Sequence, residues 1–194
     1  MKLYGLTGGV GMGKSTTAGF LLARGELVVD TDDIARELAR PGEPALVEIE
    51  NAFGKSILTP AGELNRGELA RRVFAGAPAR QRLEAILHPR IRERWLAQVE
   101  IWRQQKAPLA FVIIPLLFET QAENQFEKII CVACSGKSQR KRLLARGWSS
   151  EQVQQRIAAQ IPVEQKMARS QFVVWTEGAL EVHRRQWEHI WARL

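Results

Sequence analysis

The residues with the clearest chemical potential lie near the start of the chain. Residues 8–15 read GGVGMGKS and match the pattern G-x-x-x-x-G-K-S. Glycines let a loop turn through positive φ angles, so that backbone N–H groups converge on one point. These groups, together with the dipole of a following helix, can cradle phosphates. Lys14 can reach the β and γ phosphates of ATP, and the Ser15 hydroxyl can ligate Mg²⁺. The motif predicts a chain that binds ATP and transfers its terminal phosphate.

All three aspartates of the chain, Asp30, Asp32 and Asp33, lie within four residues. They follow an apolar run directly, and ligands of open α/β sheets lie beyond the carboxyl ends of the strands. An acid at that place can accept the proton of an acceptor hydroxyl or steer Mg²⁺. The alternative is a solvated turn in which only Asp33 suits the first turn of a helix. The functional interpretation needs fewer assumptions.

The third apolar run ends without an acid. Many phosphate-loop proteins place a magnesium-binding acid there, whereas residues 111–115 read FVIIP. Two interpretations stay open: either Glu119 reaches back to the metal, or the aspartates at 30–33 take over that role.

Basic residues gather in a stretch, residues 128–148, that contains no acid. Arg142 and Arg146 are four apart, which on one helical face places like charges together and destabilises the helix slightly. Arginine clamps accelerate phosphoryl transfer by roughly 10³–10⁵-fold. Beside a phosphate loop we therefore expect the cluster to bind polyphosphate, the alternative being a solvated face. Its members are Lys137, Arg140, Lys141, Arg142 and Arg146.

The elements that position these residues follow from hydrophobic patterns. Apolar runs predict five strands, at 2–7, 27–30, 110–114, 128–133 and 172–175. Helical patterns fall between them, which predicts an α/β fold with a parallel sheet covered on both faces. The first helix is expected to begin at the turn of residues 13–15 and to stop at Gly25. Residues 149–152 read SSEQ, a capping box that opens a later helix. The last helix is expected to face the core with Leu180, Trp187, Ile190, Trp191 and Leu194.

About 80 residues separate the second strand from the third, far more than one crossover helix needs. Helical patterns at 66–74 and 79–87 precede a long helix after Pro89, at a position where an N1 proline is tolerated. The insertion is interpreted as an acceptor-binding lobe. The alternative is a helical packing layer without ligand contacts.

Composition excludes several classes of protein. Of the residues, 45% are apolar and 25% charged, the globular average, and no apolar run approaches the roughly 18 residues of a membrane span. The first seven residues are too short and too soon broken by glycine to form a signal peptide, so we expect a cytoplasmic protein. A net charge of +7 suits polyanionic partners, either nucleic acid or phosphorylated metabolites. Cys131 and Cys134 lie on a predicted buried strand and, three apart, face opposite sides, which disfavours a shared metal.

Taken in order, these motifs resemble the dephospho-CoA kinase family over nearly the whole chain. Residues 5–16 (GLTGGVGMGKST) resemble the family's opening, and residues 30–36 (DTDDIAR) are similar to its D-A-D segment. Three further signatures are matched by residues 62–66 (GELNR), 87–89 (LHP) and 115–119 (PLLFE). Residues 155–160 (QRIAAQ) are similar to the family's lid helix.

The resemblance implies a three-layer phosphate-loop kinase with a five-stranded parallel sheet. Its core would comprise residues 1–59, 106–135 and 166–194, with a helical substrate lobe at about 60–105 and a lid at about 136–165. It also implies Mg²⁺ as cofactor and ATP and dephospho-CoA as substrates. No nucleic-acid or membrane partner is expected, and we expect a monomer with at most weak self-association.

The same resemblance assigns roles to residues. Asp32 would be the general base, with Lys14 and Arg142 also in the catalytic group. ATP would be bound by Gly9, Val10, Gly11, Met12, Gly13, Lys14, Ser15, Thr16, Arg140 and Arg146. Dephospho-CoA would be bound by Asp30, Asp32, Arg66, His88, Pro89, Leu116 and Glu119. Without the family, His88 before a proline is more simply interpreted as the first residue of a helix than as a catalyst.

One segment departs from the family. The family usually reads A-D-x-V-I-x-N near the last strand, whereas residues 168–176 read ARSQFVVWT, so that both the acid and the asparagine are missing. In the family this segment helps to form the wall beside the adenine of the nucleotide. The departure therefore concerns contact with the nucleotide base and not phosphoryl transfer. The nearest alternative function is another phosphate-loop kinase, for nucleoside monophosphates or a small polyol. A GTP-binding switch would need N-K-x-D and D-x-x-G, and neither string occurs. A nucleic-acid-binding ATPase would need an acid where Pro115 stands.

Overall fold

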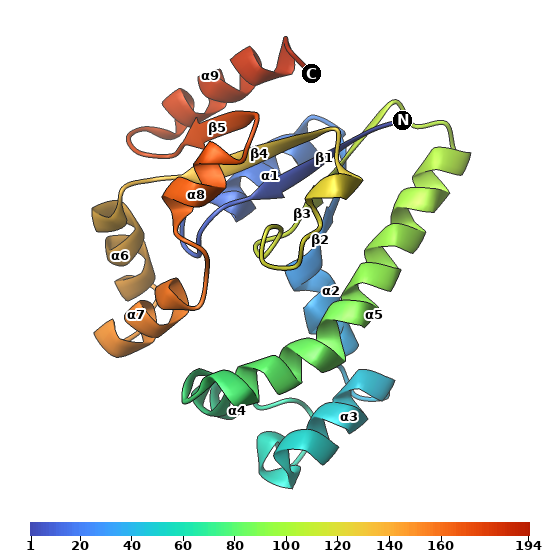
Figure 1. Ribbon diagram of the computed structural model, residues 1–194, viewed down its shortest axis with the longest axis vertical. Helices are drawn as coiled ribbons and strands as arrows, with labels where there is room; N and C mark the ends of the chain where they lie inside the picture. The colour runs from blue at the N-terminus through green and yellow to red at the C-terminus, as the bar shows by residue number, and fades with distance from the viewer. The chain divides into compact units, whose positions relative to one another are not determined.

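A five-stranded parallel sheet organises the larger of two compact units in the computed structural model, which describes residues 1–194 (Figure 1). The core unit comprises Met1–Asp30 and Trp102–Leu194, and the helical unit comprises Thr31–Ile101. The strand order is β2-β3-β1-β4-β5, and every neighbouring pair is parallel. The strands are β1 (Lys2–Thr7), β2 (Leu27–Asp30), β3 (Leu109–Ile113), β4 (Lys128–Ala133) and β5 (Phe172–Trp175). The predicted fold class is confirmed, and only the third strand is shifted, beginning and ending one residue earlier than expected.

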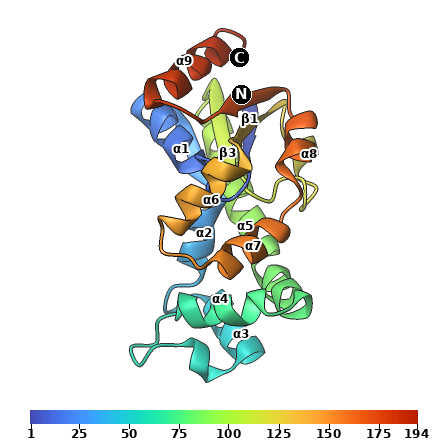
Figure 2. The same cartoon turned by 90° about the vertical axis from the view of Figure 1, so that its left-hand side faces the viewer.

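Helices cover the sheet of the core unit on both faces. The helices of the core unit are α1 (Lys14–Ala23), α6 (Gly136–Leu144), α7 (Ser150–Ala158), α8 (Val163–Ala168) and α9 (Leu180–Trp191), and it also contains a short 3₁₀ turn, η2 (Glu123–Gln125). Figure 2 shows α8 on the other side of the sheet from α1. Leu21 of α1 and Trp187 of α9 pack with Phe111, Ile130 and other strand residues in one buried cluster. Burial of these apolar side chains is the main force that holds the helices to the sheet.

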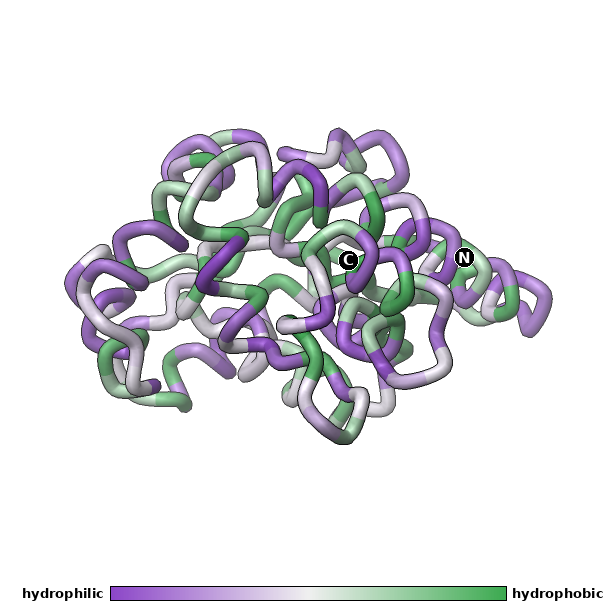
Figure 3. Tube along the Cα trace, turned by 90° about the horizontal axis from the view of Figure 1, so that it is seen from below, coloured by the Kyte–Doolittle hydropathy of each residue, from purple (hydrophilic) through white to green (hydrophobic).

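The helical unit consists of α2 (Thr31–Leu38), α3 (Pro44–Phe53), η1 (Lys55–Ile57), α4 (Arg66–Phe74) and α5 (Ala77–Gln104), whose last turn continues into the core unit. It has its own buried cluster, formed by Ile49, Ile57, Leu69 and Val73. Hydrophobic and hydrophilic residues are interspersed along the coiled segments of the chain trace (Figure 3). Such a mixture is typical of helices with one buried face.

The expectation of two helices separated at Pro89 is wrong, because one helix, α5, runs through it. A proline removes one backbone hydrogen bond and strains the preceding turn. The helix persists because Leu83, Ile86 and Leu87 pack against the cluster of the helical unit. The Arg90 guanidinium also donates to the Ile86 carbonyl at 2.8 Å, within the strained turn. His88 consequently lies inside a helix and does not begin one.

Two other expectations for helices have clear outcomes. The capping box is confirmed: the Ser149 side chain accepts from the Gln152 N–H, and the Gln152 side chain accepts from the Ser149 N–H. In the last helix, Trp187 and Ile190 are buried as predicted, but Leu180 is 59% exposed. Leu180 is the first residue of α9, and Leu194 lies beyond its end. Trp191 and Leu194 pack against the core cluster, so only Leu180 departs from the expected core-facing stripe.

The two cysteines are buried and unbridged. Cys131 lies on β4 and Cys134 directly after it. Burial raises the pKa of Cys131 to about 11, so its reactive thiolate form is scarce near neutral pH. This agrees with the prediction of plain burial. None of the helices is long and apolar enough to span a membrane.

Candidate active site

The phosphate loop joins β1 to α1, and its conformation depends on glycine. Gly8, Gly11 and Gly13 have φ angles of 144°, 75° and 102°. A Cβ atom on Gly8 would lie 2.1 Å from the carbonyl oxygen of Val132, which rules out any side chain there. Gly13 is the N-cap of α1, so the unpaired N–H groups of that helix begin directly at the loop. These features suit the anion-binding cradle that the motif predicted.

Side chains from distant segments hold the loop. The Lys14 ammonium donates to the carbonyls of Gly8 and Gly9, at 2.9 and 3.0 Å. Gln139 of α6 donates to the Val10 carbonyl at 2.8 Å, and Gln160 accepts from the Val10 N–H at 2.9 Å. Sequence reasoning gave no role to either glutamine. For Gln139 the chain offers no local signal, whereas Gln160 closes the segment that resembles the lid helix.

Arg142 lies beside the loop through a chain of hydrogen bonds. Its guanidinium donates to the side-chain oxygen of Thr176 at 2.8 Å and also to the Thr176 carbonyl. The Thr176 hydroxyl in turn donates to the carbonyl of Met12 at 2.8 Å. Arg142 is therefore placed against the end of the sheet that carries the phosphate loop.

The other members of the basic cluster are arranged differently. Arg140 is exposed on α6, and Arg146 is exposed beyond its end. The expectation that Arg142 and Arg146 share one helical face is wrong, because α6 ends at Leu144. Gly147, with a φ of 84°, follows in the turn. Their binding of ATP stays a prediction.

A buried ion pair follows the end of β3. The Lys166 side chain is fully buried, and its ammonium lies 2.7 Å from Oε1 of Glu119 and 2.7 Å from the carbonyl oxygen of Pro115. The same Glu119 oxygen accepts from the Ile161 N–H at 2.9 Å. Glu119 thus has a lysine as its closest charged partner, which favours the aspartates for the steering of Mg²⁺. Leu116 lies on the same loop and is half-buried. Lys166 was missed, because lysine is rarely buried and nothing local marks it.

Strand register places Asp30 at the same edge of the sheet as the phosphate loop. Asp30 pairs with Ile113 of β3, and Ile113 pairs with Leu6 of β1. Asp30 and Leu6 are thus level on strands two positions apart, about 10 Å by ordinary strand spacing. Leu6 stands directly before Thr7 and the loop. A carboxylate and a phosphate cradle therefore emerge at one carboxyl edge, where ligands of such sheets bind.

The remaining expected site residues belong to the helical unit. Asp32 and Asp33 lie in the first turn of α2, which begins at Thr31, and Asp33 pairs with Arg36 on the exposed surface. Arg66 begins α4 and donates to the Arg36 carbonyl at 3.4 Å. His88 lies next to Pro89 inside α5, and burial lowers the pKa of His88. Burial therefore favours the neutral form of His88.

A metal at this site would rest on few protein ligands. No three His, Cys, Asp or Glu side chains cluster in a way that could hold an ion. Mg²⁺ in kinases is commonly held by one or two protein oxygens together with substrate phosphates and water. The Ser15 hydroxyl at the start of α1 and the Asp30 carboxylate at the sheet edge suit that pattern.

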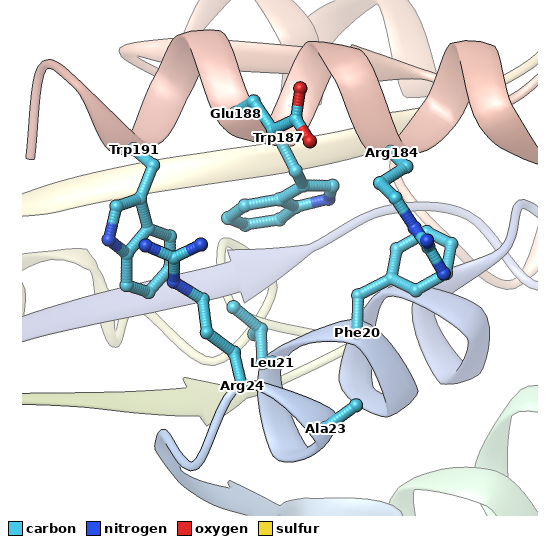
Figure 4. A pocket seen from close by; sticks show the side chains of 8 residues that line it. All are labelled: Phe20, Leu21, Ala23, Arg24, Arg184, Trp187, Glu188 and Trp191. Carbon is cyan, nitrogen blue, oxygen red and sulfur yellow. The ribbon is translucent and has the colours of Figure 1, made fainter.

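A separate cavity of about 330 Å³ lies between α1 and α9 (Figure 4). Aromatic rings form much of its wall, and guanidinium groups lie over two of them: Arg24 over Trp191 and Arg184 over Phe20. Its lining comes from the second half of α1 and from α9 and includes no residue of the phosphate loop. The cavity is therefore distinct from the candidate active site.

Comparison with known proteins decides the family. The family model described as dephospho-CoA kinase matches residues 2–181. The chain belongs to the dephospho-CoA kinase family. It is 45% identical to the dephospho-CoA kinase of Anaeromyxobacter dehalogenans over 93% of this chain and 86% of that protein. The crystal structure of TT1252 from Thermus thermophilus superposes with a TM-score of 0.81 at 34% identity, covering 100% of this chain and 97% of that one. The dephospho-CoA kinase from Campylobacter jejuni gives a TM-score of 0.71 at 26% identity, with the same coverage.

The segment that departs from the dephospho-CoA kinase pattern is well bonded. Gln171, at the position of the family's acid, accepts from the Ile129 N–H at 2.7 Å, and its own N–H donates to the Ile129 carbonyl at 3.0 Å. Thr176, at the position of the asparagine, joins Arg142 to Met12 as described above. Both replacements keep β5 and its following loop attached to β4 and the phosphate loop.

Proposed function

We propose that this chain transfers the γ-phosphoryl group of ATP to the ribose 3′-hydroxyl of dephospho-coenzyme A, giving coenzyme A and ADP in the last step of coenzyme A synthesis. The observation that carries the proposal is an intact phosphate loop in a kinase fold whose residues 2–181 match the model of this family. Phosphoryl transfer of this kind needs little covalent chemistry from the protein, and catalysis consists of positioning and charge stabilisation.

The phosphate loop supplies the donor half of the site. Backbone N–H groups at the start of α1 and the Lys14 ammonium would hold the β and γ phosphates. The Lys14 ammonium donates to the carbonyls of Gly8 and Gly9 and would exchange them for phosphate oxygens on ATP binding. The migrating phosphoryl group would be stabilised by the positive charges of Arg140, Arg142 and Arg146. Mg²⁺, held by Ser15 with Asp30 beside it, would neutralise charge on the phosphates.

Asp32 is the proposed general base. The 3′-oxygen attacks the γ-phosphorus, the bond from that phosphorus to the β–γ bridging oxygen breaks, and the hydroxyl proton passes to the Asp32 carboxylate. ADP leaves with the bridging oxygen. A ribose hydroxyl is a poor nucleophile at neutral pH, and general-base assistance contributes roughly 10²–10⁴-fold. Asp30 would orient Mg²⁺-bound water, and Asp33 contributes to the start of α2.

The acceptor is proposed to bind to the helical lobe at about 60–105, through Arg66, His88 and Pro89, with Leu116 and Glu119 shaping the site. Residues 136–165 are proposed to form a lid over the core made of residues 1–59, 106–135 and 166–194. A monomeric state and a cytoplasmic location stay predictions.

Acceptor competition tests the proposal. The protein is incubated with ATP and Mg²⁺ together with dephospho-CoA, a nucleoside monophosphate or a small polyol, and each mixture is analysed by mass spectrometry. Phosphorylation of dephospho-CoA alone is expected. Preferential phosphorylation of another acceptor would make the chain a different phosphate-loop kinase.

A further inference from the structure

Two glutamine side chains form hydrogen bonds with one residue of the phosphate loop, Val10. Gln160 accepts from the Val10 N–H at 2.9 Å, and Gln139 donates to the Val10 carbonyl at 2.8 Å. Gln139 lies on α6 and Gln160 just after α7, near the two ends of the proposed lid. All three residues belong to the core unit. Both peptide groups of Val10 are thus bonded to side chains and not to other backbone groups.

The bond from Gln139 is buried and closely fitted. Gln139 is 5% exposed, so its amide depends on protein partners and not on water. A Cβ atom on Gly9 would lie 3.2 Å from its Nε2 atom, tighter than an ordinary contact. The loop backbone and this amide therefore leave each other little room to shift.

The position of Gln160 is fixed by a hydrogen bond of the residue that follows it. The next residue, Ile161, donates its N–H to Glu119 at 2.9 Å, and Glu119 pairs with the fully buried Lys166. Gln160 is thus bonded to the phosphate loop, and its neighbour Ile161 is bonded to the buried ion pair. The position of Gln160 is consequently set by the core, not only by the exposed helix that precedes it.

The amide group itself has a chemical advantage at this place. A carboxylate of the same length could also accept from the Val10 N–H, but it would bring a negative charge next to the phosphate cradle. Like charges in a partly buried site repel strongly. A neutral acceptor holds the loop without opposing the nucleotide.

We propose that Gln139 and Gln160 are positioning residues, which fix the Val10 peptide groups so that the N–H groups following it converge on the phosphates of ATP. This inference rests on the proposed function for its kinetic part only.

The first test needs no turnover. Hydrogen exchange of the Val10 amide is measured by NMR in nucleotide-free wild type, in Gln160→Met and in the matched control Gln154→Met, an exposed glutamine on α7. Loss of one neutral hydrogen bond is expected to speed Val10 exchange by about fivefold in Gln160→Met, with no change in the control. Unchanged exchange in Gln160→Met would overturn the inference, whatever the acceptor of the enzyme is.

The second test separates positioning from general stability. Gln160→Glu retains the acceptor and has nearly the same shape, so Val10 protection is expected to stay close to wild type. Its added charge is expected to raise the Kd for ATP by more than about tenfold at low salt, and by less as salt screens it. Gln160→Met is expected to raise the KM for ATP by about fivefold, with the KM for dephospho-CoA nearly unchanged. An unchanged KM for ATP in Gln160→Met would refute the positioning role.

Discussion

Removal of the buried Lys166 ammonium should destabilise the core unit more than any change to an exposed ion pair. Lys166→Met keeps the length of the apolar stem but leaves the Glu119 carboxylate with the Ile161 N–H as its remaining hydrogen-bond donor. The other oxygen of Glu119, Oε2, is already buried without a hydrogen-bond partner. Breaking one side of a buried pair typically costs about 3–5 kcal/mol. Glu119 is 18% exposed, which places the expected loss near the lower end, at about 3 kcal/mol.

Urea unfolding followed by tryptophan fluorescence measures this loss. With an m value of about 2 kcal/mol/M, a loss of about 3 kcal/mol lowers the midpoint by roughly 1.5 M. Lys166→Met/Glu119→Gln removes the unpaired charge and is expected to recover part of the loss.

The matched control is Arg185→Met, which breaks an exposed pair whose side chains are 75% and 58% exposed. Its expected effect is below about 0.5 kcal/mol. A loss below about 1 kcal/mol in Lys166→Met would show that the pair does not stabilise the fold in this way.

Three further predictions concern the site and the helical unit. Lys14→Ala should abolish dephospho-CoA turnover while circular dichroism shows an intact fold, and near-normal turnover would contradict the role of the phosphate loop. Asp32→Asn should lower kcat by about 10²-fold or more with little change in ATP affinity. Asp33→Asn should instead cost about 0.5 kcal/mol of stability. If Asp30→Asn were inactive while Asp32→Asn stayed active, the general base would be Asp30. Hydrogen bonds from Arg71 and Arg72 lower the pKa of Glu68 to about 2, below its unfolded value of about 4.3. The stability that Glu68 contributes is therefore present above about pH 4 and lost as the pH falls towards 2, and Glu68→Gln should flatten acid unfolding, followed by circular dichroism, in that range.

The strands could be predicted because a parallel sheet covered on both faces demands continuous apolar runs. Lys128–Ala133 is such a run, and its bounds agree with the structure. The phosphate loop could be predicted because its spacing reflects a backbone requirement, which the positive φ angles of Gly11 and Gly13 now show.

Other features depend on contacts that no local pattern contains. The bonds from Gln139 and Gln160 to Val10 join residues 129 and 150 positions apart. At Pro89 the local sequence predicts a helix break, but the helix continues because apolar residues of the same helix pack against the helical unit. The proposed role of Asp32 rests on family resemblance, and the Asp32→Asn variant tests it.

The most direct test of the central claim is to incubate the protein with dephospho-CoA, ATP and Mg²⁺. The product is then analysed by mass spectrometry and by fragmentation. We predict a gain of one phosphoryl group located on the ribose 3′-oxygen, formed together with an equal amount of ADP and absent with Lys14→Ala. Unmodified dephospho-CoA alongside full hydrolysis of ATP, or phosphorylation at another position, would contradict it.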